Sequence, residues 1–293
     1  MPDKFKNSQV IKDPGDNYKT LGTRPIRHDG VDKVTGRAIY GNDVKMQGLI
    51  EGAILRSPVA HARILSIDTS AAEALPGVLA VATSADLPDP GDKISDLGEG
   101  PVNLAHLSAN CLARDKVLYK GQAVAAVAAS NIHVATEALE HIKVEYEPLP
   151  VLTWVLDAME ENAPILHEDL RTNEMGKKGE TPSNICDHLH FEQGDPDEGF
   201  EKAHLVVEKE FKTQTVHQGY IEPHVATAHW NQDGHLTVWT STQGSFSARD
   251  QTADTLGLPT SKVKVVPCEI GGGFGGKIPI YLEPVAAVLS KKS

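Results

Sequence analysis

Hydrophobic and polar positions follow two different periods in the first half of the chain. Residues 62–68 and 143–147 alternate between apolar and polar side chains, which is typical of strands with one buried face. Residues 122–129 form an almost continuous apolar run, which indicates a strand covered on both faces. Residues 131–142 instead carry apolar side chains at helical spacing. The pattern predicts a strand, a helix and a strand in succession.

A similar succession comes earlier in the chain. Residues 48–57 have a weak alternation that predicts a strand, and 62–68 follow as a second one. The spacing from Ser70 to Glu73 is that of residues that satisfy free amides where a helix begins. Pro76 and Gly77 end this short helix, and residues 78–82 predict another strand. We expect one compact α+β domain that ends near Pro148–Pro150.

The second half of the chain has a weaker pattern. Residues 157–182 are polar and rich in Glu, Asn, Lys and Gly, which is typical of a linker. An Asp-Gly pair at 233–234 favours a tight hairpin. The elements predicted beyond the linker are strands at residues 203–212, 226–230, 236–242 and 262–266 and helices at 246–256 and 282–289.

These patterns predict an α+β protein in four parts. Residues 1–33 have little apolar periodicity and predict an extended arm, and residues 34–150 form the first domain. Residues 151–182 are the linker, and 183–293 begin a second α+β domain. An apolar fraction of 40% and a charged fraction of 23% are ordinary for a folded globular chain.

Charge and cysteine content narrow the possible partners and the location. A formal charge of −12 without a basic patch argues against binding to nucleic acid or to anionic membrane surfaces. Cys111, Cys186 and Cys268 are far apart and form neither a disulfide framework nor a Cys-x-x-Cys pair. Residues 1–20 are polar and lack the features of a secretory leader, so we expect none, and no apolar run is long enough to span a bilayer. We therefore expect a cytoplasmic protein.

Five of the six residues from Gly271 to Gly276 are glycine, and Lys277 follows them. Glycine lets the backbone approach a ligand closely, so its amides can surround an anionic or polar cofactor. The loop also fits the dinucleotide pattern G-x-G-x-x-G and the triphosphate pattern G-x-x-x-x-G-K. Both are weak here, because Ile278 replaces the Ser or Thr of the triphosphate loop and no acidic residue follows at the dinucleotide spacing. A tight turn without a ligand is the remaining alternative.

Three histidines, His217, His224 and His229, raise the question of a zinc site. Their spacings do not place them on one face of a helix, so surface positions are the better interpretation. We therefore do not expect a zinc hydrolase.

The glycine loop is the last of three ordered motifs that together resemble a known family. The others are Thr240-Ser-Thr-Gln-Gly244 and His217-Gln-Gly-Tyr-Ile-Glu-Pro-His224, and with the loop they resemble the xanthine dehydrogenase and aldehyde oxidase family. Further matches lie in the first domain and resemble that family's a/b hammerhead domain: Gly22–Pro25, Asp32–Gly36, Leu55–Pro58, His61–Arg63 and Leu75–Gly77. The resemblance implies a hammerhead domain at 34–150 and the first part of an α+β molybdopterin-binding domain at 183–293.

The resemblance also implies roles for individual residues. Gln243 corresponds to the glutamine that approaches an oxo ligand of molybdenum, and Gly244, which follows it in the motif, is also expected to bind the cofactor. Phe274 is expected to be a wall of the metal and substrate pocket. The residues expected to offer backbone amides to the cofactor are Gly272, Gly273 and Gly275.

The implied function is that of the molybdenum-binding subunit of a hydroxylase, with water as the source of oxygen. The cofactor is expected to be molybdopterin with molybdenum, in its cytosine dinucleotide form, and electrons would leave through [2Fe-2S] and FAD groups on partner subunits. Ile278 stands where purine-oxidising relatives tend to have a glutamate, which favours an aldehyde or an aromatic N-heterocycle.

The family's general-base glutamate is expected beyond residue 293, in a remaining C-terminal part of the subunit, so no catalytic residue is expected within these residues. The chain is then expected to be inactive unless that part joins it. The alternative is a catalytically inactive scaffold that only docks the partner subunits.

Overall fold

The computed structural model describes residues 23–91, 93–96 and 100–293. One antiparallel sheet lies at the centre of the first domain, with β7 (Ala123–Ala129) between β1 (Glu51–Arg56) and β3 (Val78–Thr83). All seven residues of β7 are buried, which confirms the strand covered on both faces. The sheet is therefore the middle layer of this domain.

A second antiparallel sheet has β2 (Ala62–Asp68) between β6 (Lys116–Val117) and β8 (Lys143–Pro148). The predicted strands and helices occur in the expected order, but the two strands of each strand–helix–strand unit belong to different sheets. The remaining elements of this region are α1 (Gly30–Thr35), α2 (Ser70–Glu73), β4 (Ile94–Asp96), β5 (Pro101–Asn103), α3 (Leu104–Cys111) and α4 (Ile132–Glu140). Together they confirm a mixed α+β architecture.

The predicted capping of α2 by Ser70 is wrong. Thr69 is the N-cap residue, and the Ser70 hydroxyl donates a hydrogen bond to Asp68 at 2.6 Å. The Thr69 hydroxyl donates to Glu73 at 2.9 Å. A side chain that bonds locally to a preceding carboxylate is a common alternative to capping.

The third sheet lies in the second domain, in the order β12 (Ala226–Trp230), β13 (Leu236–Thr240) and β14 (Val263–Pro267). The first two strands are antiparallel around the predicted Asp-Gly turn, in which Gly234 has φ +77°. Helix α7 (Ser245–Leu256) ends at Gly257, whose φ of +63° closes the helix in the left-handed conformation. These four elements match the predicted ones within a few residues.

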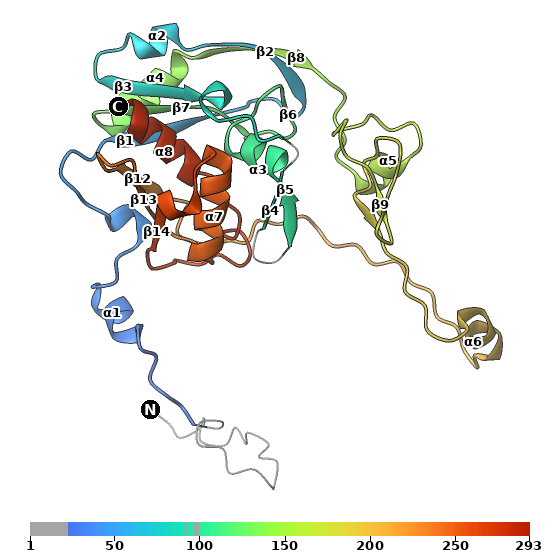
Figure 1. Cartoon of the computed structure of the whole chain (residues 1–293). Coiled ribbons are helices and arrows are strands. Elements are labelled where there is room, and N and C mark those ends of the chain that lie inside the picture. The colour runs from blue at the N-terminus through green and yellow to red at the C-terminus, as the bar shows by residue number, and fades with distance from the viewer. Residues whose placement is uncertain (1–22, 92, 97–99) are drawn as a thin grey trace.

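Helix α8 (Glu283–Lys292) packs against both domains (Figure 1). Its Val285, Val288 and Leu289 share one core cluster with Ala82 and Ala126 of the central sheet. On its other side, the indole nitrogen of Trp230 in β12 donates to a carbonyl of the helix at 2.8 Å. The two domains are therefore joined by a common core, whereas the predicted boundaries at 34, 151 and 183 stay predictions.

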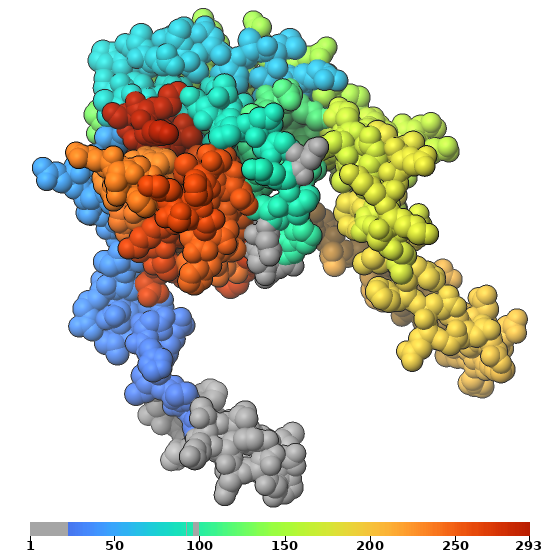
Figure 2. Space-filling model, viewed as in Figure 1, coloured from blue at the N-terminus to red at the C-terminus, as the bar shows by residue number. Residues whose placement is uncertain are grey.

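The connecting segment, which links β8 to β12, projects from this body, as the yellow part of Figure 2 shows. Its elements are α5 (Val155–Met159), β9 (Asn173–Glu174), β10 (Lys177–Lys178), β11 (Asp187–His188) and α6 (Pro196–Lys202). The strand predicted at 203–212 is wrong for this structure, because these residues pair with no other strand of the described chain. Their alternating apolar side chains are exposed, with Leu205 at 76% and Phe211 at 85%.

The predicted arm at 1–33 lies largely outside the described residues, which begin at Thr23. Within the described part of the chain, no helix combines the length and the apolar character needed to cross a bilayer.

Candidate functional site

The glycine loop and the Gln243 motif meet because of how two strands pair. β13 and β14 are parallel neighbours, and Thr240 lies opposite Pro267 at their carboxyl ends. The segments that leave parallel strands begin at the same edge of a sheet. The amide of Cys268 continues the pairing by donating to the Thr240 carbonyl at 3.0 Å. The sheet therefore brings residues 241–244 and 268–277 together.

Gln243 is fastened to the glycine loop by three hydrogen bonds. Its backbone amide donates to the Lys277 carbonyl at 3.0 Å. Its Oε1 accepts from the amides of Gly275 at 2.9 Å and Lys277 at 3.2 Å. The side-chain Nε2 of this exposed residue donates to nothing in the described ranges, and it remains available as a donor. The contact orients the amide group with its nitrogen outward.

Close packing explains why position 273 is glycine. A Cβ built on Gly273 would lie 2.5 Å from Oε1 of Gln243, a distance that real side chains do not tolerate. At Gly275 a Cβ would meet open space, but the φ of +87° itself favours glycine. Two separate physical requirements thus act on neighbouring glycines.

The middle of the loop presents backbone amides without partners. The N–H groups of Gly272, Gly273 and Phe274 donate no hydrogen bond to any described residue. Phe274 has a φ of +50°, and its side chain is 71% exposed. Successive free amides form a concave site for an anionic or polar group. The Gly275 amide differs, because Gln243 already accepts its hydrogen bond.

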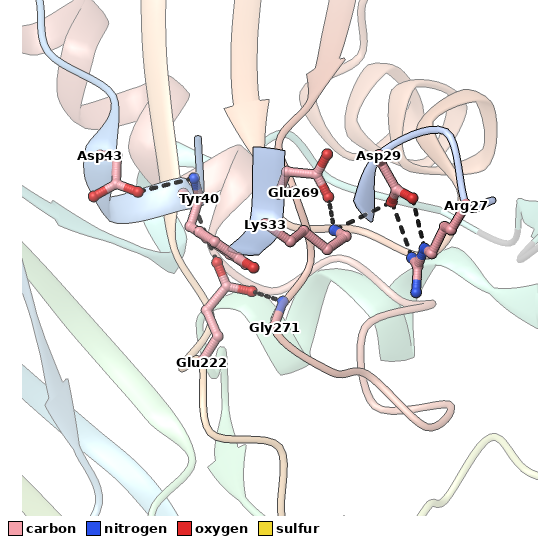
Figure 3. Close-up of polar contacts among 9 residues, drawn as sticks. Arg27, Asp29, Lys33, Tyr40, Asp43, Glu222, Glu269 and Gly271 are labelled. Atoms are coloured by element: carbon pink, nitrogen blue, oxygen red, sulfur yellow. Dashed lines mark hydrogen bonds and ion pairs between the residues drawn. The ribbon is translucent and has the colours of Figure 1, made fainter. Parts of the chain in front are cut away.

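A buried ion pair anchors the end of the loop. The Lys277 ammonium is fully buried and lies 2.8 Å from Oε2 of Glu222, whose side chain is 12% exposed. The same carboxylate accepts from the amides of Gly271 at 2.7 Å and Gly41 at 3.2 Å (Figure 3). Burial alone would raise the pKa of Glu222, but these hydrogen bonds and the lysine charge outweigh it and lower that pKa. Lys277 therefore positions the loop and presents no free charge to a ligand.

An aromatic cluster lies beside this ion pair. The Lys277 ammonium is 5.1 Å from the centre of the Tyr220 ring, and the Tyr220 hydroxyl lies 3.0 Å from Nε2 of His224. Burial, followed by the charge of Lys277, lowers the pKa of His224. The His217 ring lies 4.7 Å from the Tyr220 ring at an interplanar angle of 59°, whereas His229 is exposed on β12. Two of the three histidines discussed above thus belong to one ring cluster.

Buried polar side chains fix the chain beyond the loop. Gln251 of α7 is fully buried and accepts from the amide of Ile280 at 3.1 Å, while its Nε2 lies 3.5 Å from the Ile278 carbonyl. The Thr240 hydroxyl donates to Glu283 at 2.7 Å, and Glu283 also accepts two amides where α8 begins. Ile278 itself is half-buried.

The N-terminal part of the chain also contacts the residues just before the glycine loop. Lys33 forms an ion pair with Glu269, just before the loop (Figure 3). The Glu269 amide donates to the Ile39 carbonyl at 2.8 Å, and Tyr40 and Glu269 form an isolated bridge. The arm thus stabilises the approach to the loop.

Sequence reasoning assigned no role to Glu222, Gln251 or Glu283. The signal for Glu222 was present, since it lies inside the 217–224 motif and a buried lysine requires an acidic partner. No comparable signal marks Gln251 or Glu283. The binding roles expected of Gln243, Gly244, Gly272, Gly273, Phe274, Gly275 and Ile278 stay predictions.

Two family models match this architecture. The aldehyde oxidase and xanthine dehydrogenase a/b hammerhead domain matches residues 35–150, and the molybdopterin cofactor-binding domain matches residues 177–293. Members of the family that these models describe are molybdenum oxidoreductases. The chain belongs to the xanthine dehydrogenase and aldehyde oxidase family of molybdopterin-binding large subunits.

Individual relatives agree with this membership. The chain is 33% identical over 94% of its length to the nicotinate dehydrogenase large molybdopterin subunit of Eubacterium barkeri, covering 60% of that protein. It is 38% identical over 92% of its length to the carbon monoxide dehydrogenase large chain of Afipia carboxidovorans, covering 33% of it.

Solved structures give the same result. A quinoline 2-oxidoreductase from Pseudomonas putida 86 superposes with a TM-score of 0.78 at 29% identity, over 92% of this chain and 33% of that one. A copper- and molybdenum-containing carbon monoxide dehydrogenase superposes with a TM-score of 0.75 at 37% identity, over 92% and 34%. The chain thus spans between one third and three fifths of the length of these relatives.

Proposed function

We propose that this chain forms the front portion of the molybdenum-binding subunit of a molybdenum hydroxylase. The observation that carries the proposal is the row of three unpartnered amides at Gly272, Gly273 and Phe274 beside the outward Nε2 of Gln243. These four donor nitrogens, none of which has a partner among the described residues, suit the oxygen-rich end of a molybdopterin cofactor. When bound, that cofactor would supply two-electron oxidation of the substrate with oxygen from water.

In this proposal, the chain's own residues hold and orient the cofactor and the substrate. Gln243 donates from Nε2 because its Oε1 is occupied by two loop amides, so the donor end of the side chain is defined. The Glu222–Lys277 pair fixes the loop on its buried side. The two charges of the pair cancel, so the pair gives the loop surface no net charge. Exposed Phe274 is available as an apolar wall for a flat substrate.

Substrate preference is proposed on two grounds. Relatives named for nicotinate and for quinoline both act on aromatic N-heterocycles by name, and solved relatives include aldehyde oxidoreductases. Ile278 places an apolar side chain directly after the loop. We infer an aldehyde or an aromatic N-heterocycle as the substrate class.

The proposed assembly includes more polypeptide than these residues. Exposed apolar side chains run along the connecting segment, from Phe191 at 87% to Ile221 at 95%. Patches of this kind mark surfaces that other polypeptide covers. We infer that the rest of the large subunit, including its general-base glutamate, packs there, with iron–sulfur and FAD subunits as further partners in the cytoplasm. The pterin is proposed to be the cytosine dinucleotide form.

The test measures molybdenum and pterin content of the complete large subunit, co-expressed with its partner subunits. Gln243→Ala should reduce molybdenum content severalfold, because it removes one donor and releases two loop amides. Gln193→Ala, an exposed glutamine of the connecting segment, should leave it unchanged. If the parent complex, with both glutamines intact, assembles but contains no molybdenum, the result favours the alternative, a scaffold that only docks its partners.

A further inference from the structure

A cluster of metal-ligating side chains lies away from the glycine loop, where helix α3 meets the connecting segment. It consists of His106 on α3 and His167 and Asp169 on a turn of that segment. One potential ligand atom from each residue lies within 4.8 Å of the other two. In the described part of the chain, other groupings of three such residues do not reach this proximity.

The spacing of these three side chains suits a metal ion. Nε2 of His106 lies 3.4 Å from Oδ2 of Asp169. Two ligands on one tetrahedral zinc ion, each bonded at about 2.1 Å, are about 3.4 Å apart. The His106 and His167 rings have centres 4.5 Å apart at an interplanar angle of 44°, and a ring nitrogen of each lies within 4.8 Å of a ring nitrogen of the other.

The cluster also contains an unsatisfied polar atom. Nε2 of His106 is buried, and it lies 3.4 Å from Oδ2 of Asp169 without a well-formed hydrogen bond to that carboxylate. A buried ring nitrogen without a good hydrogen bond is unfavourable. Bonding to a metal ion would satisfy this atom.

The surroundings permit a cation. Lys116 of β6, the neighbouring cation, is already paired with Glu168 at 2.6 Å. The Asp169 side chain is 59% exposed, which leaves room for water to complete the coordination. Two neutral imidazoles and one carboxylate form a donor set of the kind that zinc and similar divalent ions prefer.

We propose that His106, His167 and Asp169 bind one divalent transition-metal ion, of which zinc is the model. The ion would join α3 of the hammerhead domain to the turn at 167–170 and so clamp the connecting segment onto the body. The site is separate from the glycine loop and does not depend on the function proposed for that loop.

Zinc titration calorimetry of the whole chain at pH 7.5 tests the proposal. It uses a Cys186→Ser background, because an exposed free thiol can itself bind added zinc. One equivalent of zinc should bind, and magnesium should not compete. His106→Gln and His167→Gln should each weaken zinc affinity by about a hundredfold or more, since loss of a metal ligand exceeds the 10- to 100-fold effect of outer partners. Asp169→Asn, at a more exposed position, should weaken it by roughly tenfold.

The matched control is His188→Gln. His188 also contacts an acidic residue, Glu174, at 3.0 Å, but it belongs to no group of three ligands, and its substitution should leave zinc affinity unchanged. Visible absorption of the cobalt-substituted chain reports the coordination directly, and circular dichroism verifies that each variant is folded. The proposal is overturned if the parent binds no zinc, if His167→Gln and Asp169→Asn bind it as tightly as the parent, or if the control loses as much affinity.

Discussion

The central sheet and the connecting segment contain similar apolar residues in opposite surroundings. Val127 of β7 is fully buried, in a strand whose alternate side chains pack on the two faces of the sheet, whereas Val207 of the connecting segment is 68% exposed. Both residues stand in stretches whose sequence predicts a strand. This comparison indicates that an apolar pattern becomes a paired strand only where the same chain supplies a partner strand and a covering layer. The body has both, whereas residues 203–212 have neither in the described part of the chain.

The same substitution at these two valines gives the largest expected contrast. Val127→Asp buries an unpaired carboxylate, and we expect a loss of several kcal/mol in the free energy of unfolding, or a failure to fold. Val207→Asp should change it by less than about 0.5 kcal/mol. Urea denaturation followed by circular dichroism measures both, and equal effects would refute the comparison.

Two lysines provide the next contrast. Lys277 is fully buried against Glu222, whereas Lys202 pairs with Glu198 on α6 with both side chains more than half exposed. Lys277→Met leaves a nearly buried carboxylate without its partner and should destabilise by about 3 kcal/mol. Lys202→Met should cost less than about 0.5 kcal/mol. If both variants melt at the parent temperature, the anchoring role of Lys277 is wrong.

Two glycines differ in the sign of the expected effect. Gly273→Ala places a Cβ 2.5 Å from Gln243 and should destabilise by about 1 to 3 kcal/mol, because the loop must shift. Gly199 lies within α6 with open space around it, so Gly199→Ala should stabilise that helix by about 0.5 to 1 kcal/mol. Thermal melts measure the first effect and hydrogen exchange of α6 amides the second. A stabilising Gly273→Ala would contradict the geometry of the loop.

The smallest expected effect is a pH dependence at Glu222. Its pKa in the folded chain is lowered from the usual 4.5, so the stability supplied by its carboxylate is complete above about pH 4.5 and is lost as the pH falls through the lowered value. The difference in melting temperature between the parent and Glu222→Gln should therefore shrink as the pH falls below 4.5. For Glu198→Gln, on the exposed helix, little difference is expected at any pH. A constant difference for Glu222→Gln would exclude the ion pair as its cause.

Local sequence signals predicted most of the body. Strands β2, β7 and β8 and helices α4 and α7 could be predicted from local signals. The periodicity of each element, and the turn or helix-breaking residues that end it, lie within the element or a few residues from it. The strand at 203–212 was not realised, since its pattern depends on a partner strand that the described residues do not provide. Which strands share a sheet depends on distant contacts that periodicity does not report.

The site shows the same division. Residue types identified the glycine loop, and the ordered motifs singled out Gln243, but nothing local shows that Oε1 of Gln243 faces the loop. Glu222 and Lys277 are 55 residues apart, and their pairing follows only from the fold. The His106 cluster likewise joins residues about sixty positions apart, and no sequence spacing marks it.

The position of α8 has a consequence for how this chain folds during synthesis. The core of the central sheet includes Ala126 of β7 and Val285 of α8, although the ribosome makes the helix more than 150 residues later. At a synthesis rate of about 5 to 20 residues per second, roughly 8 to 30 seconds separate their emergence. During that interval the sheet exposes its apolar face, and a chaperone that recognises nascent apolar surface has its main opportunity there.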